Sequence, residues 1–224
     1  ENASADSQKL QIVATIFPEY DWVKEILGDQ ADNVDLTLLL GNGTDMHSFQ
    51  PTMEDILKVS TCDLFIYVGG ESDSWVADAL KGAGNPDRKA INLMDVLGDQ
   101  VKEEELVEGM QDEDGHTHEE EHTHDDDLEY DEHVWLSLKN ASLFCDTIAS
   151  SLADVDPEHS RLYQQNAEAY EEKLAALDQE YQTSVEKSQS KTLLFADRFP
   201  FRYLIDDYNL TYYAAFAGCS AETD

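Results

Sequence analysis

Two copies of a short histidine motif carry the plainest chemistry in this sequence. The segment HTHEEEHTHDDD, residues 116–127, places His-Thr-His twice, each time followed by three acidic residues. In an extended chain the two imidazoles of a His-x-His pair point to the same side, so two neighbouring pairs could share one borderline cation. We interpret His116, His118, His122 and His124 as weak accessory metal sites, against the alternative of a merely solvated charged loop.

Three further histidines stand outside this segment. His47 lies in GTDMHSFQPT, just past a predicted strand, and His133 lies in YDEHVWLS, where neighbouring carboxylates could hold a metal-bound imidazole. From position alone, each of these two is equally well a metal ligand or a histidine bonded to its own surroundings. His159 occupies the first turn of a predicted helix, and we interpret it as a surface residue.

The charge balance limits the classes of partner. The net charge of −35 comes from 49 acidic and 14 basic residues, which argues against nucleic acid and anionic membrane surfaces and favours cations. Between residues 112 and 132, twelve of the 21 residues are acidic and none is Lys or Arg, so we expect a solvated, mobile loop over 111–129. No apolar run approaches the roughly 18 residues of a membrane helix.

The chain start and the cysteines add two expectations. The chain begins at Glu1, not Met, so we expect that a segment upstream was removed, and residues 1–8 are expected to form a flexible leader. The three cysteines show no metal-ligand spacing. Cys62 and Cys145 lie in apolar patterns and are expected to be buried free thiols, whereas the pattern around Cys219 explains nothing about its role.

Strands and helices alternate in the first half of the chain, without hairpin dipeptides between them. This order predicts parallel strands joined by crossover helices, with ligands binding beyond the carboxyl ends of the strands. The strands are predicted at 9–17, 33–40, 63–70 and 89–94, and the helices at 20–28, 52–62 and 74–81.

The second half begins with helices and returns to the strand pattern. Helices are predicted over 138–155 and 157–187, and the second, at about 1.5 Å per residue, would be roughly 45 Å long. A strand at 191–196, a helix at 199–209 and a strand at 211–216 then begin another α/β unit. The expected organisation is an N-terminal α/β lobe over 9–137, a helical connector over 138–189 and the beginning of a C-terminal α/β lobe over 190–224.

Several longer segments resemble one protein family. The segments VATIFPEYDWVKEILGD, LLGNGTDMHSFQPTMEDILKVSTCDLFIYVGG, DEHVWLSLKNA and DPEHSRLYQQNAEAYEEKLAALDQEY look like the zinc and manganese solute-binding lipoproteins of bacterial ABC importers, known as cluster A-I. The likeness runs in the same order over nearly the whole chain. An acidic His-rich loop directly before EHVWL is typical of the zinc-type members.

The resemblance implies two parallel-sheet α/β lobes joined by one long rigid helix, with one divalent metal ion in the cleft. His47 and His133 match the first two metal-ligating histidines. The third histidine of the family would stand where this sequence has Arg198, which cannot ligate a metal. Either a neighbour such as Asp197 substitutes, or the site is completed differently, or the metal affinity is reduced. The fourth ligand lies beyond residue 224, and we expect the second lobe to be truncated.

The expected function is that of an extracytoplasmic receptor, not an enzyme. The resemblance implies capture of Zn²⁺, with Mn²⁺ as the alternative, and delivery to a membrane ABC permease. It also implies a place on the bacterial cell surface or in the periplasm, with membrane attachment only through a lipid anchor upstream. The sequence contains neither His-Glu-x-x-His nor Gly-x-Ser-x-Gly. A surface adhesin or a metal buffer that uses the acidic loop is the alternative.

Overall fold

The computed structural model describes residues 9–41, 43–82, 84–105, 107, 110 and 130–218. The leader, the acidic loop with its four histidines, and Cys219 lie outside these residues. The chain forms two compact units, Glu1–Val96 with Ser142–Lys173, and Leu97–Ala141 with Leu174–Asp224. These units divide the chain at other positions than the expected lobes, whose boundaries stay a prediction.

The first unit contains a parallel sheet, as the alternating pattern predicted. Its four strands run in the order β2-β1-β3-β4, and every neighbouring pair is parallel. Ile12 in β1 lies opposite Leu36 on one side and Leu64 on the other. The strands are β1 (Leu10–Ala14), β2 (Val34–Leu38), β3 (Leu64–Tyr67) and β4 (Lys89–Asn92).

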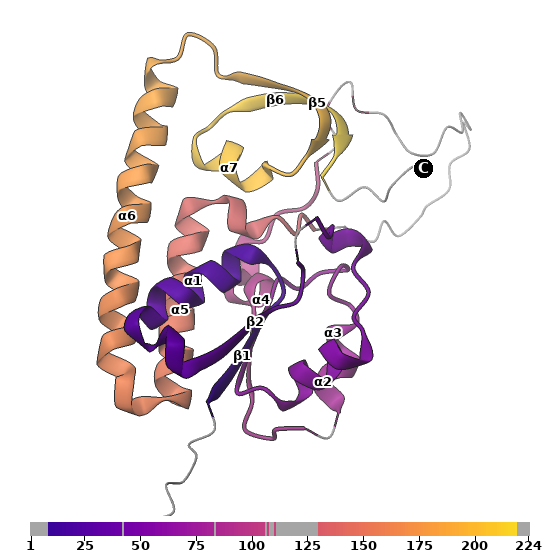
Figure 1. The fold of residues 1–224 in the computed structure, drawn as a ribbon. Helices are drawn as coiled ribbons and strands as arrows, with labels where there is room; N and C mark the ends of the chain where they lie inside the picture. The colour runs from indigo at the N-terminus through magenta and orange to yellow at the C-terminus, as the bar shows by residue number, and fades with distance from the viewer. Residues whose placement is uncertain are drawn as a thin grey trace, which may run out of the picture. The chain divides into compact units, whose positions relative to one another are not determined.

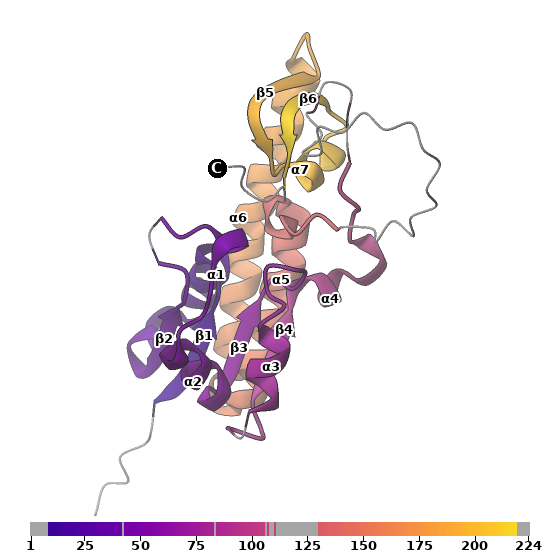
Figure 2. The same ribbon diagram turned by 90° about the vertical axis from the view of Figure 1, so that its right-hand side faces the viewer.

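The central strands β1 and β3 are buried on both faces and are mostly apolar runs, whereas the edge strands β2 and β4 are more exposed and carry polar residues. Val13 and Phe65 pack on one face against helices α2 (Met53–Thr61) and α3 (Val76–Lys81). Ile12 and its alternate neighbours along the strands are fully buried on the other face. Figures 1 and 2 show α2 and α3 on one side of the strands, and Figure 1 shows α1 (Phe17–Leu27) and α5 (Leu138–Val155) on the other.

Helix α1 (Phe17–Leu27) contacts both α5 and the long helix α6 (Ser160–Lys187). The Trp22 ring of α1 contacts Phe144 of α5 at a centroid distance of 5.7 Å. At the end of α1, Asn166 of α6 donates a hydrogen bond from Nδ2 to the carbonyl oxygen of Ile26 at 2.9 Å. A 3-10 turn, η1 (Gly28–Asn33), then leads into β2.

The connector differs slightly from the expected pair of helices. Helix α5 (Leu138–Val155) forms as predicted, but the second helix starts as the 3-10 turn η5 (Pro157–His159) before α6 (Ser160–Lys187) begins. The Asp156 carboxylate explains this start, because its Oδ2 accepts hydrogen bonds from the Tyr163 hydroxyl at 2.5 Å and from His159 Nδ1 at 2.8 Å. His159 is therefore bonded locally.

The second unit contains a βαβ arrangement. Strands β5 (Thr192–Phe199) and β6 (Thr211–Ala217) pair in parallel, with α7 (Arg202–Asp207) between them in the sequence. Strand β5 extends three residues beyond the prediction, because Pro200 has no backbone N–H and keeps Phe199 extended. The core of this arrangement includes the stacked rings of Phe199 and Tyr212, whose centroids are 3.7 Å apart.

Short elements link these parts. They are η2 (Met46–Ser48), α4 (Leu93–Leu97), η3 (Gly98–Gln100), η4 (Val134–Leu136) and an isolated antiparallel bridge between Glu103 and Tyr130.

Among the described residues, no helix combines the length and apolar character needed to cross a membrane.

A fully buried carboxyl group follows strand β1. Glu19 Oε2 accepts hydrogen bonds from the backbone N–H of Thr15 at 2.8 Å and of Ile16 at 3.1 Å, while Oε1 has no hydrogen-bond partner among the described residues. Burial, reinforced by the negative charge of Asp73, raises the pKa of Glu19 from 4.5 to about 8, although those hydrogen bonds lower it. The carboxyl group is thus mostly protonated at neutral pH in the folded protein.

This raised pKa predicts that the protein loses stability as the pH rises. Below pH 4.5 Glu19 is protonated in both states, whereas between 4.5 and about 8 the unfolded chain releases the proton and the folded chain retains it. The free energy of unfolding should therefore fall by up to roughly 1.4 kcal/mol per pH unit over this range. Urea unfolding at about pH 6 and about pH 8 measures the fall.

Glu19→Gln should flatten this dependence, because the amide is uncharged at both pH values. Glu25→Gln, on the same helix but in an exposed ion pair with Lys173, is the matched control and should keep the wild-type slope. Equal slopes in wild type and Glu19→Gln would contradict the assignment of the buried proton to Glu19.

Candidate metal centre

His47 is held at the carboxyl end of the sheet by two polar neighbours. It lies in η2, which follows strand β2, and its backbone N–H donates to Asp45 Oδ1 at 3.0 Å. Its ring Nδ1 lies 3.0 Å from the hydroxyl oxygen of Ser72, in the loop that follows β3. Because parallel strands end at the same edge, the two loops can supply one hydrogen-bonded pair. In the tautomer in which Nδ1 donates to the Ser72 hydroxyl, Nε2 carries the lone pair that can bind a metal ion.

His133 is buried and is held by Asp131 at two points. Its backbone N–H donates to Asp131 Oδ1 at 2.8 Å, and its ring Nδ1 lies 3.1 Å from the same oxygen. The carboxylate can only accept, so in the neutral form of the ring Nδ1 carries the proton and Nε2 carries the lone pair. This is the carboxylate–histidine arrangement that fixes the tautomer of metal-binding imidazoles.

The turn after β6 closes one side of the His133 ring. A Cβ atom built on Gly218 would stand 3.4 Å from His133 Cε1 and only 2.6 Å from the carbonyl oxygen of Phe199. A larger residue would therefore have to push the backbone of β5. The close approach keeps the end of β6 beside the imidazole.

Arg198 lies in a distorted part of strand β5. The register of β5 against β6 shifts between Phe195 and Arg198, and the Arg198 backbone N–H donates to Asp197 Oδ1 at 2.8 Å. Arg198 pairs with Phe216 in β6 and is partly buried, while Asp197 is exposed. A guanidinium is cationic at every relevant pH, so this position brings a positive charge instead of a metal ligand.

The candidate ligands belong to different parts of the chain. His47 belongs to one compact unit and His133 to the other. Within residues 9–41, 43–82, 84–105, 107, 110 and 130–218, no group of three or more His, Cys, Asp or Glu side chains is placed to hold a metal ion. The four loop histidines lie outside these ranges. A shared site therefore stays a proposal.

Sequence reasoning anticipated a carboxylate next to His133 but missed the partner of His47. Ser72 lies 25 residues away from His47, in the ESDS segment that follows the two glycines after β3. The only signal available was the cluster of polar residues at the end of a buried strand. Their position at the carboxyl edge of a parallel sheet would have been the reason to consider them as partners of His47.

The two described cysteines are buried free thiols, as expected from their apolar surroundings. Burial raises the pKa of Cys62 and of Cys145 to about 12. Cys62 also donates from Sγ to the carbonyl oxygen of Val59 at 3.2 Å. Because the thiolate is the metal-binding form, neither residue is a candidate ligand.

Comparison with known proteins gives a consistent result. The family profile described as "Zinc-uptake complex component A periplasmic", ZnuA, matches residues 12–224. The zinc-binding lipoprotein AdcA of Streptococcus pneumoniae serotype 4 is 34% identical over 217 residues, which are 96% of this chain and 40% of that protein. The high-affinity zinc uptake system protein ZnuA of Bacillus subtilis is 34% identical over 209 residues, which are 92% of this chain and 61% of that protein.

Solved structures agree with this comparison. The Zn(II)-bound ZnuA-like domain of Streptococcus pneumoniae AdcA superposes with a TM-score of 0.70 at 28% identity, over 93% of this chain and 67% of that one. The metal-dependent lipoprotein YcdH of Bacillus subtilis superposes with a TM-score of 0.73 at 28% identity, over 95% and 68%. The chain thus spans from about two fifths to about three fifths of the length of the two curated relatives.

The buried thiols generate a prediction that can be checked without metal. Cys62 and Cys145 should react with iodoacetamide at about pH 8 at least roughly 100-fold more slowly in the folded protein than in urea, because little thiolate is present and the sulfur atoms are covered. Mass spectrometry of the labelled peptides follows each cysteine separately. Labelling of Cys62 at the same rate in both conditions would contradict its raised pKa and its burial.

Proposed function

This chain belongs to the ZnuA family of periplasmic zinc-uptake components, and on that premise we propose that it is part of an extracytoplasmic receptor for Zn²⁺. The receptor would capture the ion and deliver it to a membrane ABC permease. The names of the two curated relatives mention zinc binding and zinc uptake, but both proteins are much longer than this chain. The activity of this chain is therefore proposed from its own residues as well as from that similarity.

The observation that carries the proposal is the fixed tautomer of His133. A buried carboxylate accepts from Nδ1 at 3.1 Å and from the backbone N–H at 2.8 Å, so in the neutral form of the ring the proton is on Nδ1 and the lone pair is on Nε2. Neutral imidazole with an ordered outer partner is the form that binds zinc.

His47 supports the same function from the other unit. When its Nδ1 donates to the Ser72 hydroxyl, the lone pair of the neutral ring is on Nε2, as it is in His133. We propose that both imidazoles bind one ion. Two imidazoles favour Zn²⁺ over Mn²⁺, because manganese prefers carboxylate and other oxygen ligands.

The remaining ligands are proposed to differ from the set expected by resemblance. Arg198 cannot take the place of a third histidine, and the neighbouring Asp197 carboxylate accepts a hydrogen bond from its backbone. Asp197 is exposed and stays a candidate ligand. His116, His118, His122 and His124 are proposed as weak accessory sites that gather ions near the main site.

The proposed setting is the outside of a bacterial cell, on the surface or in the periplasm, with attachment through a lipid anchor upstream. A net charge of −35 concentrates cations around the protein. We propose capture and release without a catalytic step. Nothing in the described residues favours an adhesin or a metal buffer, and both are outcomes that the following experiment can detect.

Calorimetric titration with Zn²⁺ and Mn²⁺ tests the proposal. The chain should bind one zinc ion tightly, with weaker additional sites, and bind manganese less tightly. His47→Ala and His133→Ala should each weaken the tight site by more than the roughly 10–100-fold that loss of an outer partner costs. A variant without residues 112–128 should lose only the weak sites.

His159→Ala is the matched control, because it removes an imidazole that is bonded to Asp156 and is not assigned to the metal. It should leave all binding unchanged. If only the loop deletion abolishes binding, the chain acts as a buffer and the receptor proposal fails. Equal affinities at several sites would lead to the same conclusion.

A further inference from the structure

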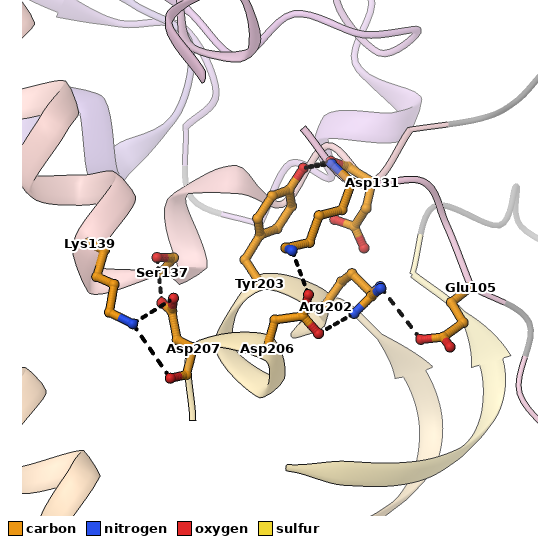
Figure 3. A network of polar contacts seen from close by, with 9 residues as sticks. Glu105, Asp131, Ser137, Lys139, Arg202, Tyr203, Asp206 and Asp207 are labelled. Atoms are coloured by element: carbon orange, nitrogen blue, oxygen red, sulfur yellow. Dashed lines mark hydrogen bonds and ion pairs between the residues drawn. The ribbon is translucent and has the colours of Figure 1, made fainter. Parts of the chain in front are cut away.

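A buried tyrosine of helix α7 lies directly behind the backbone of Asp131. The Tyr203 side chain is 2% exposed, and its hydroxyl donates to the carbonyl oxygen of Asp131 at 2.8 Å. The same hydroxyl accepts from the backbone N–H of Lys102 at 3.1 Å. Figure 3 shows Tyr203 pointing from α7 toward Asp131.

These contacts form a closed ring of hydrogen bonds. The Asp131 backbone N–H donates to the carbonyl oxygen of Lys102 at 2.9 Å, which completes the circuit Lys102, Tyr203, Asp131. The ring fixes both polar groups of the Asp131 backbone. The Asp131 side chain, in turn, fixes the backbone and the ring of His133.

We propose that Tyr203 is a positioning residue for the metal-binding imidazole of His133, acting through Asp131. This inference rests on the proposed function, because it concerns how well His133 is held for a metal ion. Tyr203 does not itself ligate. Its hydroxyl fixes the peptide plane from which the Asp131 carboxylate reaches His133, and thereby fixes the direction of Nε2.

Helix α7 is anchored firmly enough to serve as the support. Asp206 pairs with Lys102 Nζ at 2.5 Å and with Arg202 at 2.5 Å, and Arg202 also approaches Glu105 at 3.6 Å. Burial alone would raise the pKa of Asp206, but the contacts with Lys102 and Arg202 outweigh it and hold the pKa below its ordinary value. The carboxylate therefore stays ionised and paired.

A second anchor ties α7 to the segment after His133. Asp207 Oδ2 accepts from the Ser137 hydroxyl at 2.6 Å, and Asp207 pairs with Lys139 at 3.2 Å. Figure 3 shows the contacts of Asp206 and Asp207 on neighbouring residues of the same short helix. Helix α7 thus contacts the chain both before and after the candidate ligand, and the Tyr203 hydroxyl contacts it at Asp131.

The hydroxyl and the ring of Tyr203 can be separated by mutation. Tyr203→Phe keeps the buried ring but leaves the Asp131 carbonyl and the Lys102 N–H without this partner, which frees the Asp131 peptide to reorient. Tyr208→Phe is the matched control. Tyr208 is also a buried tyrosine of this unit, and it donates one hydrogen bond to the Asp178 carboxylate at 2.9 Å, away from Asp131.

The experiment measures the His133 ring first and zinc second. In the metal-free chain at about pH 8, nitrogen-15 NMR should show His133 as one tautomer protonated at Nδ1, in wild type and in Tyr208→Phe. Tyr203→Phe should show a mixture of tautomers. Its zinc dissociation constant should rise roughly 10-fold, while Tyr208→Phe stays within about twofold of wild type.

The two measurements separate the two proposals. If the wild-type chain binds no zinc through His133, the proposed function fails, yet the tautomer still decides whether Tyr203 positions the ring. An unchanged tautomer in Tyr203→Phe overturns the inference, whatever the zinc affinity. Equal changes in Tyr203→Phe and Tyr208→Phe also overturn it, because they would reflect a general loss of stability.

Discussion

The requirement that a parallel sheet be covered on both faces organises the first unit of this protein. Strands that are buried on both sides must be joined by crossover helices, and these bring every strand's carboxyl end to one edge. Val13 and Phe65 face α2 and α3, while Ile12 and Leu64 face the opposite side. The edge formed by this arrangement carries His47 and Ser72, which come from loops far apart in the sequence.

Buried carboxyl groups accept backbone hydrogen bonds in three loops of the protein. Glu19 accepts backbone N–H groups after β1, Asp73 accepts those of Val68 and Gly69 after β3, and Asp131 accepts that of His133. In a chain with an excess of acidic residues, most carboxylates remain solvated. Glu19, Asp73 and Asp131 are buried and bonded to backbone donors, which offsets part of the cost of removing them from water.

In the second unit, a helix of only six residues is attached to the chain on both sides of His133. Helix α7 is too short to be stable by itself, and ion pairs and hydrogen bonds from two of its acidic residues attach it to the segments on either side of His133. Arg198, on the neighbouring strand, adds a positive charge where the resemblance led us to expect a third imidazole. Because Arg198 occupies the position of the expected third histidine, the residues of this chain differ from the ligand set that the family resemblance implies.

The order of strands and helices and the parallel sheet could be predicted from the sequence, because apolar periodicity is a property of neighbouring residues, whereas the choice of His47 and His133 came from the family resemblance and stays a proposal. The sequence did not determine the end of β5, where Pro200 restricts Phe199, or the 3-10 start of the long helix at Pro157. That Nδ1 is the hydrogen-bonded nitrogen of both His47 and His133 became clear only from the three-dimensional structure. Ser72 is 25 residues from His47 and Tyr203 is 72 residues from Asp131, and contacts at such separations depend on how the chain returns to itself.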